Sequence, residues 1–278
     1  MSRRRGRALL SLVVVAAVAA GAVAGWRALD LRGERPSKPA RPVSSSAGLA
    51  RVERVVDGDT VVLAGGDRVR IAGINTPEKG EELAAEASAL ARRLAEGRDA
   101  EVRAPVRRRD AYRRLLGDVV VDGRSLREAM LEAGLAHVML IPPYDPAEAA
   151  RLLEVEAGAR AARRGIWGTP RFAGALHVTS ARIDGDDGCH SRVANVSGRP
   201  LDLAGYRVRA GRAALDLPRA VLAPGRTVLV KCGEGRDRAD GPAQQTVHWA
   251  DGSSAMTRGE TIGVEAPDGT RVDSASVR

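Results

Sequence analysis

Oxygen-bearing and cationic side chains recur between residues 56 and 78, at spacings that two neighbouring strands would bring together. Asp59 precedes the first of these strands, whereas Asn75, Thr76 and Glu78 follow the second. Carboxylate, amide and carbonyl oxygens are the ligands that hard cations such as Ca²⁺ prefer in proteins. Arg70 lies on the second strand, and its planar guanidinium can hold two phosphate oxygens at once. A cation site, a phosphate clamp and a carboxylate base together predict a hydrolase.

These groups flank two strands that are expected to form a hairpin. Residues 60–63 and 68–74 are joined by the turn Ala64-Gly65-Gly66-Asp67, and they are expected to pair as antiparallel strands. The start of the first strand then lies beside the end of the second, so the oxygen ligands meet at one rim. Each piece also has a plain structural interpretation, since Asp-Gly is an ordinary turn and Thr-Pro-Glu an ordinary helix start.

Three segments in a fixed order carry a family resemblance. They are D-G-D-T at residues 57–60, R-x-x-x-x-N-x-P-E at residues 70–78 and D-x-Y-x-R at residues 110–114. The combination resembles the staphylococcal nuclease (thermonuclease) family and is more specific than any one motif. It covers about residues 51–168 and implies an OB-fold barrel that hydrolyses DNA and RNA with Ca²⁺ as cofactor.

The resemblance also implies a role for individual residues. In the Ca²⁺ site, Asp59 and Asn75 would supply side-chain oxygens and Thr76 its backbone carbonyl, with Asp57 just outside this shell. Glu78 would be the general base that deprotonates the attacking water.

The implied substrate contacts come from both strands and the third motif. Arg70 and Arg114 would clamp the phosphate and stabilise the charge that develops on it in the transition state. Tyr112 and Arg113 are the further candidates for substrate binding.

Two positions depart from the family pattern. Asn75 stands where the best-known members carry Asp, which removes a charge from the metal site and predicts weak Ca²⁺ binding, at the roughly millimolar level of extracellular sites. Arg113 stands where the family often has Gly, so it either adds a phosphate contact or crowds the turn.

The elements expected for residues 51–168 follow the order of a five-stranded OB-fold barrel with three helices. Hydrophobic periodicity and capping residues predict strands at residues 51–56, 60–63, 68–74, 100–106 and 115–121, and helices at residues 82–96, 125–134 and 145–164. Trp167, after the last helix, is predicted to fill the core.

Beyond residue 170 the chain changes to short β-type runs broken by Gly, Pro and Asp. Residues 195–206, 222–225, 259–261 and 268–273 resemble the lamin-tail family, which implies an immunoglobulin-like β-sandwich over residues 174–278. This part offers no catalytic constellation. It is therefore expected to be a binding or spacing module with an unidentified partner.

Two cysteines, Cys189 and Cys232, lie in this C-terminal part. A disulfide between them is the economical interpretation for an exported chain. The alternative is a zinc site that adds His190 and His248, but adjacent Cys and His rarely bind one tetrahedral ion and the paired C-x2-C spacing is missing.

The N-terminus predicts export. Four arginines among the first seven residues precede an uncharged run at residues 8–26, which indicates a signal peptide or a signal anchor over residues 1–26. The run is long enough to span a bilayer but contains the small-x-small pattern Ala22-Val23-Ala24, so cleavage and anchoring both stay open. Residues 27–50 are rich in Pro and Ser and are expected to form a disordered linker.

Overall charge does not argue for a nucleic-acid partner. The chain has a net charge of +9, but nine basic and two acidic side chains lie within residues 1–50. The functional interpretation is an exported, monomeric, Ca²⁺-dependent nuclease that acts on DNA and RNA with little sequence specificity and meets a membrane only through residues 1–26. The alternative is a catalytically weak or inactive protein that binds nucleic acid or a surface with the same barrel.

Overall fold

The computed structural model describes residues 49–103, 109–110, 112–184, 188–239 and 244–278. Residues 47–278 form one compact unit. The predicted signal segment at residues 1–26 and nearly all of the predicted linker lie outside the described residues. Within the described ranges, no helix is both long enough and apolar enough to cross a membrane.

The elements form two β-rich regions that follow one another along the chain. In the first region they are β1 Ala50–Asp57, β2 Thr60–Leu63, β3 Arg68–Ile71, β4 Ile74–Asn75, α2 Ala84–Ala95, β5 Asp99–Arg103, β6 Leu115–Val121, β7 Arg124–Ser125, α3 Leu126–Glu132, β8 His137–Val138 and α4 Pro146–Ala161. Two 3₁₀ turns, Gly165–Gly168 and Pro170–Phe172, lead to the second region. Its elements are β9 Leu176–Asp184, β10 Gly188–Asn195, β11 Leu201–Asp202, β12 Arg207–Ala210, β13 Ala213–Asp216, β14 Val221–Leu222, β15 Thr227–Cys232, β16 Arg238–Ala239, β17 Gln244–Trp249, α5 Gly252–Ala255, β18 Thr261–Glu265 and β19 Arg271–Ser276.

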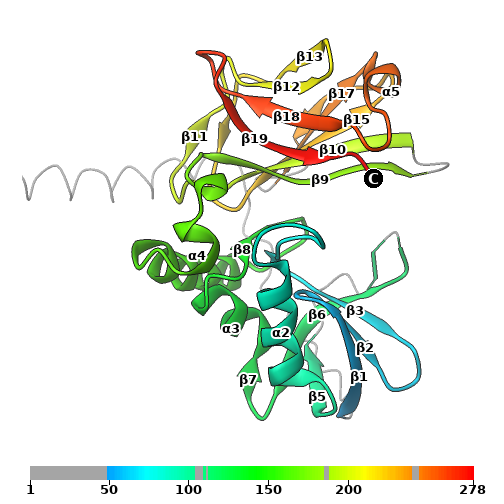
Figure 1. The fold of residues 1–278 in the computed structure, drawn as a ribbon, viewed down its shortest axis with the longest axis vertical. Helices are drawn as coiled ribbons and strands as arrows, with labels where there is room; N and C mark the ends of the chain where they lie inside the picture. Colours follow the sequence, from blue (N-terminus) through cyan, green and yellow to red (C-terminus); the bar gives the residue numbers. More distant parts are fainter. Residues whose placement is uncertain (1–48, 104–108, 111, 185–187, 240–243) are drawn as a thin grey trace, which may run out of the picture. The chain divides into compact units, whose positions relative to one another are not determined.

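The first region is a closed five-stranded barrel with three helices, as the sequence predicted (Figure 1). The strands run in the order β3-β2-β1-β5-β6, and the ring closes because β3 also pairs in parallel with β6. All four side chains of β2 are buried, which explains why this short β-branched segment holds its register in the middle of the sheet. The predicted caps are present: Ser125 accepts a bond from the Glu128 N–H, and Asp145 accepts bonds at the start of α4.

One predicted strand is divided. The sequence suggested a continuous strand at residues 68–74, but β3 ends at Ile71 and β4 begins at Ile74. Gly73 between them has a φ of +86°, a left-handed conformation that ends the extended chain. The turn redirects Asn75, which pairs with His137 of β8 rather than with the barrel sheet.

The second region packs two sheets over one core. A sheet of order β16-β17-β15-β10-β9 faces a sheet of order β13-β12-β18-β19. Residues from both sheets, among them Val193, Val230 and Ile262, form one buried cluster. Cys189 of β10 and Cys232 of β15 are joined in a disulfide with Cα atoms 5.2 Å apart. The lamin-tail assignment stays a prediction, as does the division into domains at residues 51–168 and 174–278.

A third cluster joins the two regions. Trp167 is buried, as predicted, with Ala159 of α4 and Val196, which follows β10. Beside it the ring of His137 packs edge-on against His177, with ring centroids 5.3 Å apart. Burial lowers the pKa of His137 to about 3, and the neighbouring His177 adds to this effect.

The buried His137 predicts a loss of stability in acid. Its folded-state pKa lies below the unfolded value of 6.5, so its contribution is fully present above pH 6.5 and is lost as the pH falls from there toward 3. In that pH window, His137 should change the free energy of unfolding by up to about 1.4 kcal/mol per pH unit. Urea unfolding of wild type and His137→Phe between pH 7 and pH 4 measures it. We expect a flatter curve for the variant, and parallel curves would refute the assignment.

Candidate functional site

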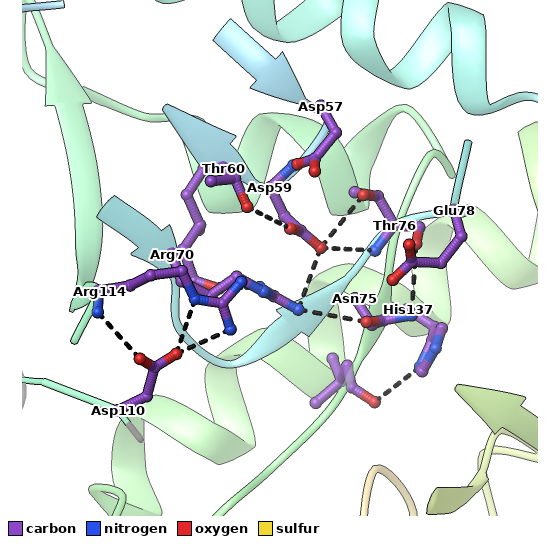
Figure 2. Close-up of polar contacts among 12 residues, drawn as sticks. Asp57, Asp59, Thr60, Arg70, Asn75, Thr76, Glu78, Asp110, Arg114 and His137 are labelled. Carbon is purple, nitrogen blue, oxygen red and sulfur yellow. Dashed lines mark hydrogen bonds and ion pairs between the residues drawn. The ribbon is translucent and has the colours of Figure 1, made fainter. Parts of the chain in front are cut away.

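Four of the predicted site residues are bonded to one another at the end of the β2–β3 hairpin (Figure 2). Oδ2 of Asp59 accepts hydrogen bonds from the N–H and the hydroxyl of Thr76, both at 3.1 Å. The same oxygen lies 3.0 Å from Nη2 of Arg70, and this nitrogen also donates to Oδ1 of Asn75 at 3.2 Å. The amide of Asn75 donates to the backbone carbonyl of Thr76 at 3.3 Å. The expected convergence at one rim is therefore present in the structure.

Local backbone geometry fixes this arrangement. The Ile71 N–H donates to the Asp59 carbonyl at 2.8 Å, which sets the end of β3 against the start of β2. Gly58 lets the Thr76 segment approach, because a Cβ at residue 58 would lie 2.9 Å from the Cβ atoms of Thr76 and Ala87. The D-G-D turn and the N-T-P-E segment thus pack directly on each other.

Asp57 lies beside this group. Its Oδ1 accepts a hydrogen bond from the Asp59 N–H at 3.2 Å. Burial, together with the charge of Asp59, raises the pKa of Asp57 to about 6. A second carboxylate close to Asp59 raises the negative potential of the rim.

Arg114 is oriented by Asp110. Its Nε and Nη2 both lie 2.7 Å from Oδ2 of Asp110, and its backbone N–H donates to Oδ1 at 2.9 Å (Figure 2). The guanidinium also lies 5.3 Å from the centroid of the Tyr112 ring. Asp110 is a positioning residue that sequence reasoning did not single out, although it opens the D-x-Y-x-R motif.

Glu78 is held by a chain of polar contacts that begins in the second region. Its backbone N–H donates to Oε2 of Glu81 at 2.8 Å, and Oε1 of Glu81 lies 3.0 Å from Nη1 of Arg171. Nε of Arg171 donates in turn to Asp273 at 3.1 Å. The Glu78 carboxylate itself forms an ion pair of 2.6 Å with Arg278, and both side chains are partly exposed.

One cavity of about 460 Å³ is lined by most of the predicted site residues, namely Asp57, Asp59, Arg70, Asn75, Glu78, Tyr112 and Arg114, together with Asp110. Thr76 and Arg278 do not line it. Arg113 does not line it: its side chain is exposed, and its φ of +63° is a left-handed conformation that favours glycine. Sequence reasoning gave no role at this site to Arg182 and Arg192, two cationic wall residues from the second region, and considered His190 only as a zinc ligand.

The oxygen atoms of the rim fit a hard cation in kind and in convergence. Asp59 Oδ2 and Asn75 Oδ1 already point at one positive nitrogen, Nη2 of Arg70, at 3.0 and 3.2 Å. The donors are carboxylate, amide and carbonyl oxygens, which is the set that Ca²⁺ prefers. In the described part of the chain, no three His, Cys, Asp or Glu side chains are grouped so that they could bind a metal ion. A cation at this rim would therefore depend on amide and backbone carbonyl oxygens as well as on a carboxylate.

Comparison with known proteins agrees with this geometry. Residues 68–169 match the family model described as staphylococcal nuclease homologue. The matched range contains Arg70, Asn75, Thr76, Glu78 and Arg114, whereas Asp59 precedes it. No curated protein matches the chain.

Proposed function

We propose that this chain is a Ca²⁺-dependent nuclease that hydrolyses phosphodiester bonds of DNA and RNA, because residues 68–169 match the family model described as staphylococcal nuclease homologue. The observation that carries the proposal is the bonded group of Asp59, Arg70, Asn75 and Thr76. Its first three members line the cavity that Glu78 and Arg114 also line. Cation ligands, phosphate donors and a carboxylate base are thus gathered within one cavity.

Asp59 and Asn75 would hold the cation through side-chain oxygens and Thr76 through its carbonyl, with Asp57 adding negative charge beside them. When bound, Ca²⁺ supplies positive charge that polarises a phosphoryl oxygen. The chain's own contribution is to keep these oxygens together, which the hydrogen bonds of Thr76 to Asp59 do.

Arg70 and Arg114 would bind the phosphate. Among the described residues, the bonds of Arg70 to Ile71, Asp59 and Asn75 engage three of its five N–H donors, which leaves donors for an anion. Arg114 presents a guanidinium fixed from behind by Asp110. Donors fixed before the reaction stabilise developing negative charge without a cost of reorganisation.

Glu78 would act as the general base. It takes a proton from water while the water oxygen bonds to phosphorus and the bond between phosphorus and the departing ester oxygen breaks. Solvent water then gives that oxygen a proton, and Glu78 returns its own proton to solvent. Before this step the carboxylate has to leave Arg278. Both partners are partly exposed, so separating them costs little, on the order of 1 kcal/mol or less.

Asn75 is expected to set the affinity of the site for Ca²⁺. The change Asn75→Asp adds a carboxylate and should tighten Ca²⁺ binding by about one to two orders of magnitude, because ligand charge tunes affinity. Asn75→Ala removes an oxygen and should weaken binding. Calorimetry with Ca²⁺ on the wild type and both variants measures this. Micromolar binding by the wild type, or equal affinity in all three proteins, would contradict the proposal.

The proposal includes export of the protein from the cytoplasm. The N-terminal pattern described above and the disulfide between Cys189 and Cys232 both support an oxidising location outside the cytoplasm, either secreted or anchored by residues 1–26.

Digestion assays test the function. The full chain is incubated with single-stranded DNA, plasmid DNA and RNA, in millimolar Ca²⁺ and in excess chelator. We expect degradation of DNA and RNA in Ca²⁺ alone. The alternative function is that of a weak or inactive protein that binds nucleic acid or a surface with the same barrel. It is supported by the ion pairs of Arg70 with Asp59 and of Arg278 with Glu78, because they occupy the carboxylates that the reaction needs. Binding of nucleic acid without degradation at any Ca²⁺ concentration would favour that alternative.

A further inference from the structure

The second region presents two arginines toward the candidate site, Arg182 of β9 and Arg192 of β10. On β9 and β10, Arg182 lies opposite His190 and Arg192 lies opposite Ser180 in the antiparallel register. Residues of alternate parity, such as Ala181, Cys189 and Val193, are buried in the core of the sandwich. Because successive side chains of a strand point to opposite faces, the two arginines share the outer face.

This outer face lines the same cavity of about 460 Å³ as Arg70, Glu78 and Arg114. The guanidinium of Arg182 lies 5.9 Å from the centroid of the Tyr112 ring, which is also approached by Arg114 at 5.3 Å. One aromatic ring is therefore approached by a cation of the barrel and by a cation of the sandwich.

Among the described residues, no carboxylate forms an ion pair with either of the two arginines. Arg192 donates to two neutral acceptors, Thr227 Oγ1 at 2.9 Å and Gln244 Oε1 at 2.5 Å. In contrast, Arg70 and Arg114 each form an ion pair with a carboxylate. Burial lowers the pKa of Arg192 to about 10, so it still carries its charge at neutral pH. An unpaired cation in a partly closed cavity is costly unless an anion joins it.

We propose that the outer face of β9 and β10 is a second phosphate-binding subsite, which holds the backbone of a single-stranded polynucleotide beside the phosphate at which the barrel acts. The proposal rests on the proposed nuclease function. A cavity of about 460 Å³ has the size of a small-molecule pocket, which takes a nucleotide of one strand but not a duplex. The sandwich would thus decide which substrates the barrel can cleave.

The test compares Arg182→Gln, Arg192→Gln and the double variant with the wild type on a twelve-nucleotide single strand and on a dinucleotide. Each single change should raise KM for the long substrate about fivefold to tenfold and lower the salt slope of binding by about 0.7. The effect on the dinucleotide should be at most about twofold, because one phosphodiester cannot reach both subsites. Arg182→Lys and Arg192→Lys should restore most of the binding, since they keep the charge. Wild type should also cleave the single strand faster than a duplex of the same sequence.

Arg207→Gln is the matched control, because Arg207 is an exposed arginine of β12 paired with Asp216 and does not line the cavity. An unchanged KM and salt slope in both glutamine variants, with wild-type cleavage intact, would overturn the subsite and leave the nuclease function standing. Binding of the long strand without cleavage would remove the nuclease function, and the salt slopes would still decide the subsite. If the wild type neither binds nor cleaves the long strand, both the subsite and the nuclease function are overturned. If Arg192→Gln fails to fold, as thermal unfolding would reveal, Arg182→Gln alone carries the decision.

Discussion

Glu78→Gln should lower kcat by about 10²- to 10⁴-fold, the usual contribution of a positioned general base. The amide has nearly the same shape as the carboxylate but cannot accept the proton from water. Stability should hardly change, because the ion pair lost with Arg278 is partly exposed. Binding of a single-stranded oligonucleotide should be kept. Steady-state cleavage and fluorescence anisotropy on the same oligonucleotide measure both quantities.

Glu132→Gln is the matched control. Glu132 is an exposed carboxylate that pairs with Arg124 on the barrel, away from the cavity wall. It should retain full activity. A Glu78→Gln protein that keeps more than about a third of wild-type kcat would show that another group, or hydroxide from solution, takes the proton.

Removing the disulfide should lower the free energy of unfolding by about 4 kcal/mol. Cys189 and Cys232 are 43 residues apart, and the chain-entropy model gives this value for a loop of that length. The bond ties β10 to β15, so its loss should also loosen the strand that carries Arg192. The double variant Cys189→Ala, Cys232→Ala avoids leaving one unpaired thiol. Urea unfolding of the variant and of wild type, with and without reductant, measures the change.

Reductant itself supplies the control. It should destabilise wild type toward the level of the double variant and leave the variant unchanged. A difference of less than about 1 kcal/mol between oxidised wild type and the variant would contradict the prediction.

The hairpin at the candidate site was predictable because its information is local. The alternating apolar residues of β3 and the turn at residues 64–67 set the register of β2 and β3. Asp59 and Thr76 meet because antiparallel strands return the chain to the same end. The break at Gly73 was not anticipated, since a glycine within an apolar run gives no sign of its φ.

The contacts that reach the site from the second region could not be derived from the sequence. Glu78 and Arg278 are 200 residues apart, and nothing in the spacing of either segment points to the other. Arg182 and Arg192 show only the alternation of a half-buried strand, which is equally compatible with a face exposed to solvent. The side of the barrel on which this face lies is decided by the packing of Trp167 and Ala159 against Val196.

The central claim is that the rim of Asp59, Asn75 and Thr76 supports Ca²⁺-dependent hydrolysis by Glu78. The single-turnover rate of cleavage of a labelled single-stranded oligonucleotide, followed across a Ca²⁺ titration of the full chain, tests it most directly. We expect no cleavage in chelator and a rate that saturates at roughly millimolar Ca²⁺. Cleavage that persists in chelator, or a bound oligonucleotide that stays intact at saturating Ca²⁺, would contradict it.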